Sequence, residues 1–329
     1  MNKSMSRREA LRWLTLTAAA SLVACQPTNQ AQNQPQSNAQ PAEPVDNQPV
    51  NTPQTNTPSA DQAYLSVVHG QDPAAITEAA VRALGGMERF VQNGFNVIIK
   101  PNICTDYYSY EYGATTNPIV VATLVSLALG AGAGRVRVMD YPFGGSAESA
   151  YVVSGIADAV QAAGGEMEVM NPAKFRSTQI PDGVSISNWD IYQDVLDCDL
   201  FINVPIAKQH GLATMTAGCK NMLGVIENRS AIHAQMGERI PDLVSLLRPE
   251  LTVVDAIRTL MQNGPTGGSL DDVQINNTVI ASHDVVTCDA YATRFLGLTP
   301  ADIPYIVHAA ERGLGVMDLN SVRIDETSL

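Results

Sequence analysis

The sequence predicts an α/β fold, with a mainly parallel sheet flanked by helices, and two observations support it. From about residue 61 onward, short apolar runs typical of buried strands alternate with segments that carry helix start and stop signals. Strands separated by helices form right-handed βαβ units, in which neighbouring strands run parallel. Polar residues also follow several strands directly, as at a ligand site of an open α/β sheet. We therefore expect a Rossmann-like arrangement in one lobe or in two.

The elements of the first half follow one another regularly. Pro73 opens a helix, because proline lacks only an N–H that the first turn does not use. Gly130, Gly132 and Gly134 lie between a helix and the next strand, which is the reverse of the order in a dinucleotide-binding fingerprint. They predict a helix end and a tight turn. The predicted elements are strands at 64–68, 96–99, 135–139 and 166–170 and helices at 73–84, 118–129 and 147–162.

The second half begins with a stretch, 171–191, that we expect to be irregular. The apolar run that follows predicts a buried strand, which Pro205 ends. Ser282 is the expected N-cap of a later helix, because its hydroxyl can accept a backbone N–H. The predicted elements are strands at 200–204, 251–255 and 277–281 and helices near 214–226, at 284–296 and at 302–312.

The N-terminus carries two targeting patterns in register. Ser6-Arg7-Arg8 begins a twin-arginine motif, and the apolar stretch 14–24 is too short to span a bilayer. It ends in Leu22-Val23-Ala24-Cys25, which resembles a bacterial lipobox. Residues 1–25 are therefore predicted to be a twin-arginine signal with lipidation at Cys25, and the alternative is an uncleaved anchor or a chance match. The expected location is a bacterial membrane surface, facing the periplasm or the cell exterior.

Residues 26–60 separate this signal from the folded body. Gln, Asn, Pro, Thr and Ser dominate them, so they cannot bury enough surface to fold and should form a disordered tether. Residues 61–329 suffice for one large α/β domain or for two small ones. The net charge of −13 argues against nucleic acid as a partner, and lipid on Cys25 is the only expected membrane contact.

Four cysteines remain after Cys25. Their wide spacing contains no CxxC pair and no iron–sulfur cluster signature. Three disulfide pairings stay open, and we favour four buried free thiols. The four are Cys104, Cys198, Cys219 and Cys288.

Candidate chemistry concentrates after the strand at 200–204. His210 follows that strand, Lys220 comes ten residues later, and His233 lies beyond it. A histidine can move protons or bind a metal, and a buried lysine can act as a nucleophile or hold an anion. We predict His210 and Lys220 to be catalytic. We predict His233, with Asp255, to be metal ligands, although Asp255 could instead cap its strand end.

Residues after two other strands are candidates for ligand binding. Lys100 and Asn102 follow the strand at 96–99, and Asp140 follows the strand at 135–139. Gly144 and Gly145 come between that strand and the next helix, so their backbone N–H groups could cradle an anion. The equally open alternative is a plain loop with Ser146 as N-cap. The expected ligand is a small anionic molecule.

Several short motifs in the same order resemble the DUF362 family along nearly the whole body. The resemblance implies an α/β fold without a defined chemistry, and the ferredoxin-like cysteine motifs of some members are absent here. The motifs are Ile99-Lys100-Pro101-Asn102, Thr116-Asn117-Pro118-Ile119-Val120-Val121, Val138-Met139-Asp140, Ile202-Asn203-Val204-Pro205, Lys220-Asn221-Met222-Leu223-Gly224, Leu251-Thr252-Val253-Val254-Asp255-Ala256-Ile257, Asn263-Gly264-Pro265-Thr266-Gly267-Gly268 and Asp289-Ala290.

The stretch 199–233 is also similar to the core of nickel-pincer lactate racemases. That similarity implies an acid/base role for His210, a cofactor-holding role for Lys220 and nickel ligation by His233. The implied cofactor is a metal or a group tethered to Lys220. A second acid/base histidine of those enzymes has no counterpart here, because the loop 140–146 contains none.

Two hypotheses from different classes follow. The first is an exported enzyme that uses a metal or tethered cofactor for proton or hydride transfer on a small anionic substrate. The second is a non-catalytic lipoprotein that binds a ligand or a metal.

Ser282-His283-Asp284 is no catalytic triad, since adjacent residues cannot assemble one, and the nucleophile-elbow, P-loop and zinc-protease motifs are absent.

Overall fold

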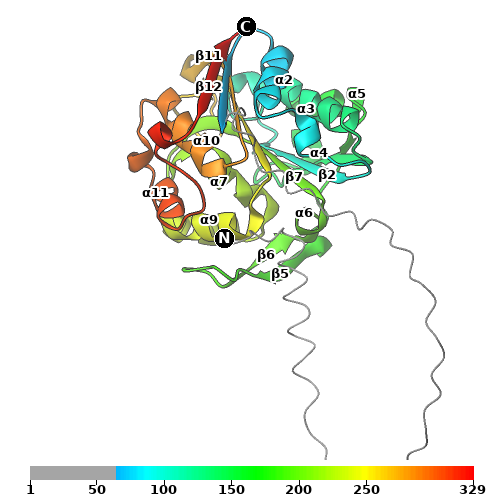
Figure 1. Ribbon diagram of the computed structural model, residues 1–329. Coiled ribbons are helices and arrows are strands. Elements are labelled where there is room, and N and C mark those ends of the chain that lie inside the picture. Colours follow the sequence, from blue (N-terminus) through cyan, green and yellow to red (C-terminus); the bar gives the residue numbers. More distant parts are fainter. Residues whose placement is uncertain (1–63) are drawn as a thin grey trace, which may run out of the picture. The chain divides into compact units, whose positions relative to one another are not determined.

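A mixed, mostly parallel sheet lies between two groups of helices in the computed structural model, which describes residues 64–329 (Figure 1). The predicted signal, Cys25 and the tether lie outside the described residues. None of the helices within 64–329 is long and apolar enough to cross a membrane.

Ten strands form the main sheet. Parallel pairing runs from β10 through β7, β2 and β3 to β4, whereas β11 is antiparallel to both β10 and β1. Two further strands, β8 and β9, extend the sheet beside β10. In spatial order the strands are β12 (Ile324–Ser328), β1 (Leu65–His69), β11 (Val273–Ser282), β10 (Leu251–Leu260), β7 (Leu200–Val204), β2 (Asn96–Pro101), β3 (Arg135–Val138) and β4 (Glu166–Met167), with β8 (Ile206–His210) and β9 (Thr214–Thr216) off this path.

Helices cover both faces of the sheet (Figure 1). One face packs its alternate strand residues, such as Ile99 and Ile202, against apolar side chains such as Leu124 of the covering helices. The helices of this face are α2 (Pro73–Ala83), α3 (Pro118–Gly130), α4 (Ala147–Val153) and α5 (Ile156–Ala162). The other group comprises α7 (Gly218–Asn221), α9 (Met236–Leu247), α10 (Val285–Ala292) and α11 (Pro304–Glu311). Two short helices, α6 (Gln193–Asp197) and α8 (Arg229–Ile232), lie in connections.

The predicted α/β class and mainly parallel sheet are confirmed, with three local corrections. The helix expected at 147–162 is two helices, because Gly155 has a left-handed backbone (φ +76°) between α4 and α5. The stretch 171–191, expected to be irregular, contains the hairpin of β5 (Phe175–Gln179) and β6 (Asn188–Tyr192). The helix expected near 214–226 begins only after β9, because 214–216 pairs with β8.

Pro205 interrupts the strand at 200–204 but does not end the extended chain, which corrects the expectation that the strand stops there. The Pro205 carbonyl still accepts the N–H of Asp255, at 2.8 Å. Proline removes only its own donor, so the chain continues as β8 alongside β10. His210 is therefore the last residue of a strand.

Of three smaller predictions, two are confirmed and one is wrong. The four cysteines are buried thiols that form no disulfide among residues 64–329, as favoured. The glycine-rich segment after α3 forms the expected helix end and turn, with Gly132 at φ +99°. The N-cap assigned to Ser282 is wrong, because the Asp284 carboxylate accepts the N–H groups of Val286 and Thr287. The Ser282 hydroxyl instead accepts the N–H of Asp284 itself.

Candidate functional site

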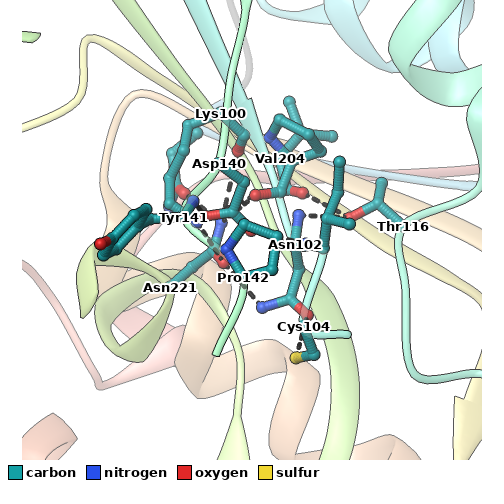
Figure 2. Close-up of polar contacts among 12 residues, drawn as sticks. Lys100, Asn102, Cys104, Thr116, Asp140, Tyr141, Pro142, Val204 and Asn221 are labelled. Carbon is teal, nitrogen blue, oxygen red and sulfur yellow. Dashed lines mark hydrogen bonds and ion pairs between the residues drawn. The ribbon is translucent and has the colours of Figure 1, made fainter. Parts of the chain in front are cut away.

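The order of the strands creates a switch point beside β2. The chain passes from β2 outward to β3 and β4, and then returns to place β7 on the opposite side of β2. Connections therefore leave the carboxyl ends of β2 and β7 in opposite directions, which opens a crevice there. Figure 2 shows the polar side chains that fill this edge of the sheet, including Lys100 from β2 and Asp140 after β3.

A cavity of about 770 Å³ occupies this edge, a volume within the usual range for small-molecule sites. Its polar lining comes from β2, β8, α7, α8 and the loops that follow β2 and β3. Apolar wall is supplied by residues such as Ile103, Phe143 and Leu223. The titratable side chains that line it are Lys100, Cys104, Asp140, Tyr141, Lys208, His210, Lys220, Arg229 and His233.

Lys100 forms a buried ion pair at the floor of the cavity. Its Nζ lies 2.8 Å from Asp140 Oδ1 and also donates to Asn221 Oδ1 and to the Pro101 carbonyl, both at 2.9 Å. An ammonium has three N–H donors, so all of them are engaged. Burial lowers the pKa of Lys100, and Asp140 opposes that shift. Lys100 thus contributes positive charge to the cavity but has no N–H donor left for a ligand.

Lys208 is a second cavity lysine, which the sequence analysis did not single out. Its fully buried Nζ contacts Asn102 Oδ1 at 3.0 Å, the Ala114 carbonyl at 2.6 Å and the Pro265 carbonyl at 2.9 Å. Cys104 Sγ lies 3.0 Å from the same nitrogen. Side chains two residues apart in a strand lie on the same face, so Lys208 lies on the same side as His210. This relation is hidden in the sequence when Pro205 is taken as the end of the strand.

Asn102 connects the two engaged lysines. Its Oδ1 accepts from Lys208. Its Nδ2 donates at 2.8 Å to Asn221 Oδ1, which also accepts from Lys100 (Figure 2). Asn221 donates in turn to Asn203 Oδ1 at 2.8 Å. The amides therefore fix the floor of the cavity, and Asn102 has little capacity left for a ligand.

Lys220 differs from the other two lysines, because its Nζ has no hydrogen-bond or ion-pair partner among residues 64–329. The side chain is 8% exposed and lies against the cavity. Burial, together with the positive charges of Lys208, Arg229 and Lys100, lowers the pKa of Lys220 to about 8. This nitrogen faces the cavity and is therefore available to a ligand there.

His210 is held as a neutral hydrogen-bond donor. The N–H groups of Leu212 and Ala213 both donate to its Nδ1, at 3.1 and 3.2 Å. Nδ1 must therefore be the unprotonated nitrogen, and the ring proton lies on Nε2. Burial and the nearby Lys220 and Lys208 lower the pKa of His210 to about 3. In this state the ring can donate a hydrogen bond from Nε2, but its Nδ1 lone pair is already engaged. It therefore has no lone pair to accept a proton, which differs from the acid/base role expected for His210.

His233 has the opposite tautomer. Its Nδ1 lies 2.8 Å from the Arg229 carbonyl, which can only accept, so Nδ1 carries the proton. Burial lowers the pKa of His233, which favours the neutral ring with a lone pair on Nε2. The rings of His210 and His233 stack with their centroids 6.0 Å apart. The cavity therefore contains one fixed donor and one acceptor of similar shape.

Arg229 joins the loop after β3 to α8. Its guanidinium donates to the carbonyls of Tyr141 and Pro142, at 2.5 and 3.1 Å, and lies over the Tyr141 ring. These contacts bring His233, four residues later, to the cavity edge.

The anion cradle predicted at Gly144 and Gly145 is wrong. Neither glycine lines the cavity, and the N–H of Gly144 donates to the Cys104 carbonyl at 3.4 Å. The Asp106 carboxylate fills the space beside Gly145, where an added Cβ would lie 2.0 Å from Oδ1. A carboxylate already occupies the concavity, so an anion is repelled there. The alternative holds instead, with Ser146 as the N-cap of α4.

Asp255 lies outside the cavity lining and is not brought into a metal site with His233. Its carboxylate accepts the N–H groups of Asn117 and Ile257, at 2.7 and 2.9 Å, and so ties α3 to β10. Asp289 does the same for α7, where it accepts the N–H groups of Gly218 and Cys219, at 2.5 and 2.9 Å. Burial raises the pKa of Asp255 to about 6 and that of Asp289 to about 7.

The charge of the cavity is strongly one-sided. Four cationic side chains line it (three lysines and Arg229), and Asp140 is the single carboxylate among the lining residues. The described residues contain no group of three or more His, Cys, Asp or Glu side chains that could hold a metal ion. The lining therefore carries more positive than negative charge, and residues 64–329 offer no ready set of metal ligands.

Fold and site together define an α/β protein with a cationic, ligand-sized cavity at the switch point of its sheet. The model of the family described as "Domain of unknown function (DUF362)" matches residues 97–294, well over half of the chain. The chain belongs to the DUF362 family, which confirms the resemblance drawn from its motifs.

Two known proteins are similar to this chain. The thylakoid-associated protein sll1697 of Synechocystis sp. is 30% identical over 242 residues, which cover 71% of this chain and 72% of that protein. The lactate racemase apoprotein from Thermoanaerobacterium thermosaccharolyticum matches with a TM-score of 0.43 and 12% identity. That match covers 70% of this chain and 57% of the racemase, so this chain spans little more than half the racemase's length.

Proposed function

We propose that the cavity binds a small molecule bearing a carboxylate or phosphate and that the protein is an enzyme that transfers a proton to or from it. The observation that carries this proposal is the amine of Lys220, which is nearly buried, faces the cavity and lacks a partner among the described residues. The surplus of positive charge around it supports an anionic ligand.

The three groups have separate roles in this proposal. The Lys220 ammonium and the Nε2–H of His210 bind anionic oxygens of the ligand, since both can donate into the cavity. The Nε2 lone pair of His233 accepts a proton from a carbon next to the carboxylate. A purely binding site has no need for a second histidine in the opposite tautomer, so we favour the enzyme over the non-catalytic lipoprotein.

A binding experiment tests the first role. Titration calorimetry with pyruvate, malate and inorganic phosphate is expected to show saturable binding of at least one anion, with a loss of ten-fold or more in Lys220→Gln. Lys174→Gln is the matched control, because Lys174 is 41% exposed and paired with Asp194 and Glu168 away from the cavity. Equal affinity in the wild type and Lys220→Gln would contradict the proposal.

An exchange experiment separates enzyme from binder. Deuterium uptake from D₂O at the carbon next to the carboxylate of a bound anion is followed by NMR. His233→Gln should retain binding and lose exchange. His308→Gln is the control, because His308 is partly exposed and contacts the Gly237 carbonyl in the same manner outside the cavity. Binding without exchange in the wild type would favour the non-catalytic lipoprotein.

We also propose that the chain is exported by the twin-arginine route and anchored through lipid on Cys25. The motifs in residues 6–25 support this, and the Synechocystis relative is named as a thylakoid-associated protein. Labelling with radioactive palmitate should mark the wild type and not Cys25→Ser. An unlabelled wild type would refute the anchor.

A further inference from the structure

We propose, on the basis of the anion-binding function above, that Lys220 forms an imine with the carbonyl carbon of a small oxo acid. Three lysines, Lys100, Lys208 and Lys220, line the same cavity and differ in whether their nitrogen is available to react. Only a nitrogen with a free lone pair and an open path to a ligand can attack a carbonyl group.

Hydrogen bonding excludes two of the lysines. The three donors of Lys100 engage Asp140, Asn221 and Pro101, so its nitrogen is held as an ammonium beside a carboxylate. Lys208 is enclosed by three oxygen acceptors and Cys104 Sγ and is 0% exposed. Lys220 has no such partner within the described part of the chain. The geometry thus leaves one amine of three facing the cavity.

The surroundings of Lys220 also favour its neutral form. Burial removes the hydration that an ammonium needs, and Lys208, Arg229 and Lys100 add positive charge nearby. The resulting pKa of about 8 leaves a useful fraction of free amine near neutral pH. A lysine placed in an apolar pocket beside other cations is an established way to activate this nucleophile.

The two histidines supply the proton movements that imine formation needs. The Nζ lone pair attacks the carbonyl carbon and a C–N bond forms; His233 Nε2 accepts one proton from the attacking nitrogen and passes it to the oxygen, which gives a carbinolamine. His233 Nε2 then accepts the second N–H proton and delivers it to the hydroxyl, which leaves as water when the C–O bond breaks and the C=N bond forms. The Nε2–H of His210 stabilises the carbonyl oxygen while charge develops there. Amine and ketone become imine and water, with no oxidant or reductant.

The cavity selects a carbonyl compound that carries an acid group. Once the imine forms, Lys208 and Lys100 still provide positive charge for the carboxylate. Ile103, Phe143 and Leu223 provide apolar wall for a short carbon chain. The predicted substrate class is therefore a small 2-oxo acid.

Reductive trapping tests the inference. The full purified chain is incubated with pyruvate, 2-oxoglutarate or oxaloacetate and sodium cyanoborohydride, and the intact mass and peptide masses are then measured. We expect one reduced adduct per chain, on the peptide that contains Lys220, with a rate that rises as the pH passes through about 8. Lys174→Arg should trap normally, and Lys220→Arg should trap less than a tenth as much.

The outcomes separate this inference from the function on which it rests. Calorimetric binding of an oxo acid without any adduct overturns the imine and leaves the anion site intact. An adduct on Lys100, Lys208 or exposed lysines instead of Lys220 also overturns it. Peptide mapping of the wild type decides this even if Lys220→Arg fails to fold. Absence of both binding and adduct for every anion overturns the proposed function itself.

Discussion

The buried pair of Lys100 and Asp140 makes a sharp prediction about stability. Their charged atoms lie 2.8 Å apart and their side chains are 1% and 4% exposed. At an effective dielectric constant of about 20, that separation corresponds to an attraction of roughly 6 kcal/mol. Lys100→Met leaves the Asp140 carboxylate with the N–H groups of Ile103 and Tyr141 but without its counter-charge. We expect the free energy of unfolding to fall by about 3–5 kcal/mol.

The double variant Lys100→Met/Asp140→Asn isolates the cause of that loss. With both charges removed, only hydrogen bonds are lost, so the double variant should be more stable than Lys100→Met by at least about 2 kcal/mol. Urea unfolding, followed by circular dichroism, measures the wild type, Lys100→Met, Asp140→Asn and the double variant. Arg82→Met is the control, because Arg82 and Glu78 form an exposed pair that is expected to contribute less than about 0.5 kcal/mol. A loss below about 1 kcal/mol in Lys100→Met, or strictly additive losses, would refute the reasoning.

Three further predictions concern the surroundings of the cavity. Gly224→Ala should lose about 3 kcal/mol in urea unfolding, since its Cβ would lie 1.9 Å from Asp140 Oδ1 and 2.5 Å from Lys100 Nζ; a neutral effect would contradict the packing. Lys220→Met should be more stable than the wild type at pH 7 by up to about 3 kcal/mol, because burial lowers the pKa of Lys220 to about 8 in the folded protein, well below the usual value for lysine of about 10.5. That difference should shrink as the pH rises from 8 to 10.5. The wild type should lose stability as the pH rises from about 4 to about 7, because burial raises the pKa of Asp289 to about 7 in the folded state, which then binds a proton that the unfolded state has already lost. Asp289→Asn should remove this loss of stability.

Control variants and contradicting outcomes are available for these three predictions. Gly130→Ala should be harmless, because nothing lies within 4 Å of its added Cβ. Lys174→Met should not be stabilising, since Lys174 is paired with Asp194 and Glu168. If Lys220→Met is less stable than the wild type at pH 7, the amine has a partner and the argument for a ligand fails. If Asp289→Asn keeps the full pH slope, other groups cause it.

The sequence alone determined the layered α/β architecture. Strand cores such as 97–99 and 200–204 are apolar because helices cover both faces of a parallel sheet. Each strand shows this requirement in its own few residues, so the strand can be recognised without the rest of the fold. Helix starts such as Pro73 and Pro118 are equally local. The same locality explains why the edge of the sheet with Lys100, Asp140 and His210 was predicted as the site, since strand ends can be read one strand at a time.

Only the tertiary structure decided what each of those residues can do. The partners that engage Lys100 come from β2, the loop after β3 and α7, and those of Lys208 come from residues about 60 to 100 positions away. The tautomers of His210 and His233 depend on backbone groups that orient one ring nitrogen each. Free and engaged lysines look alike in a sequence. They differ only once folding places, or fails to place, acceptors around a buried charge.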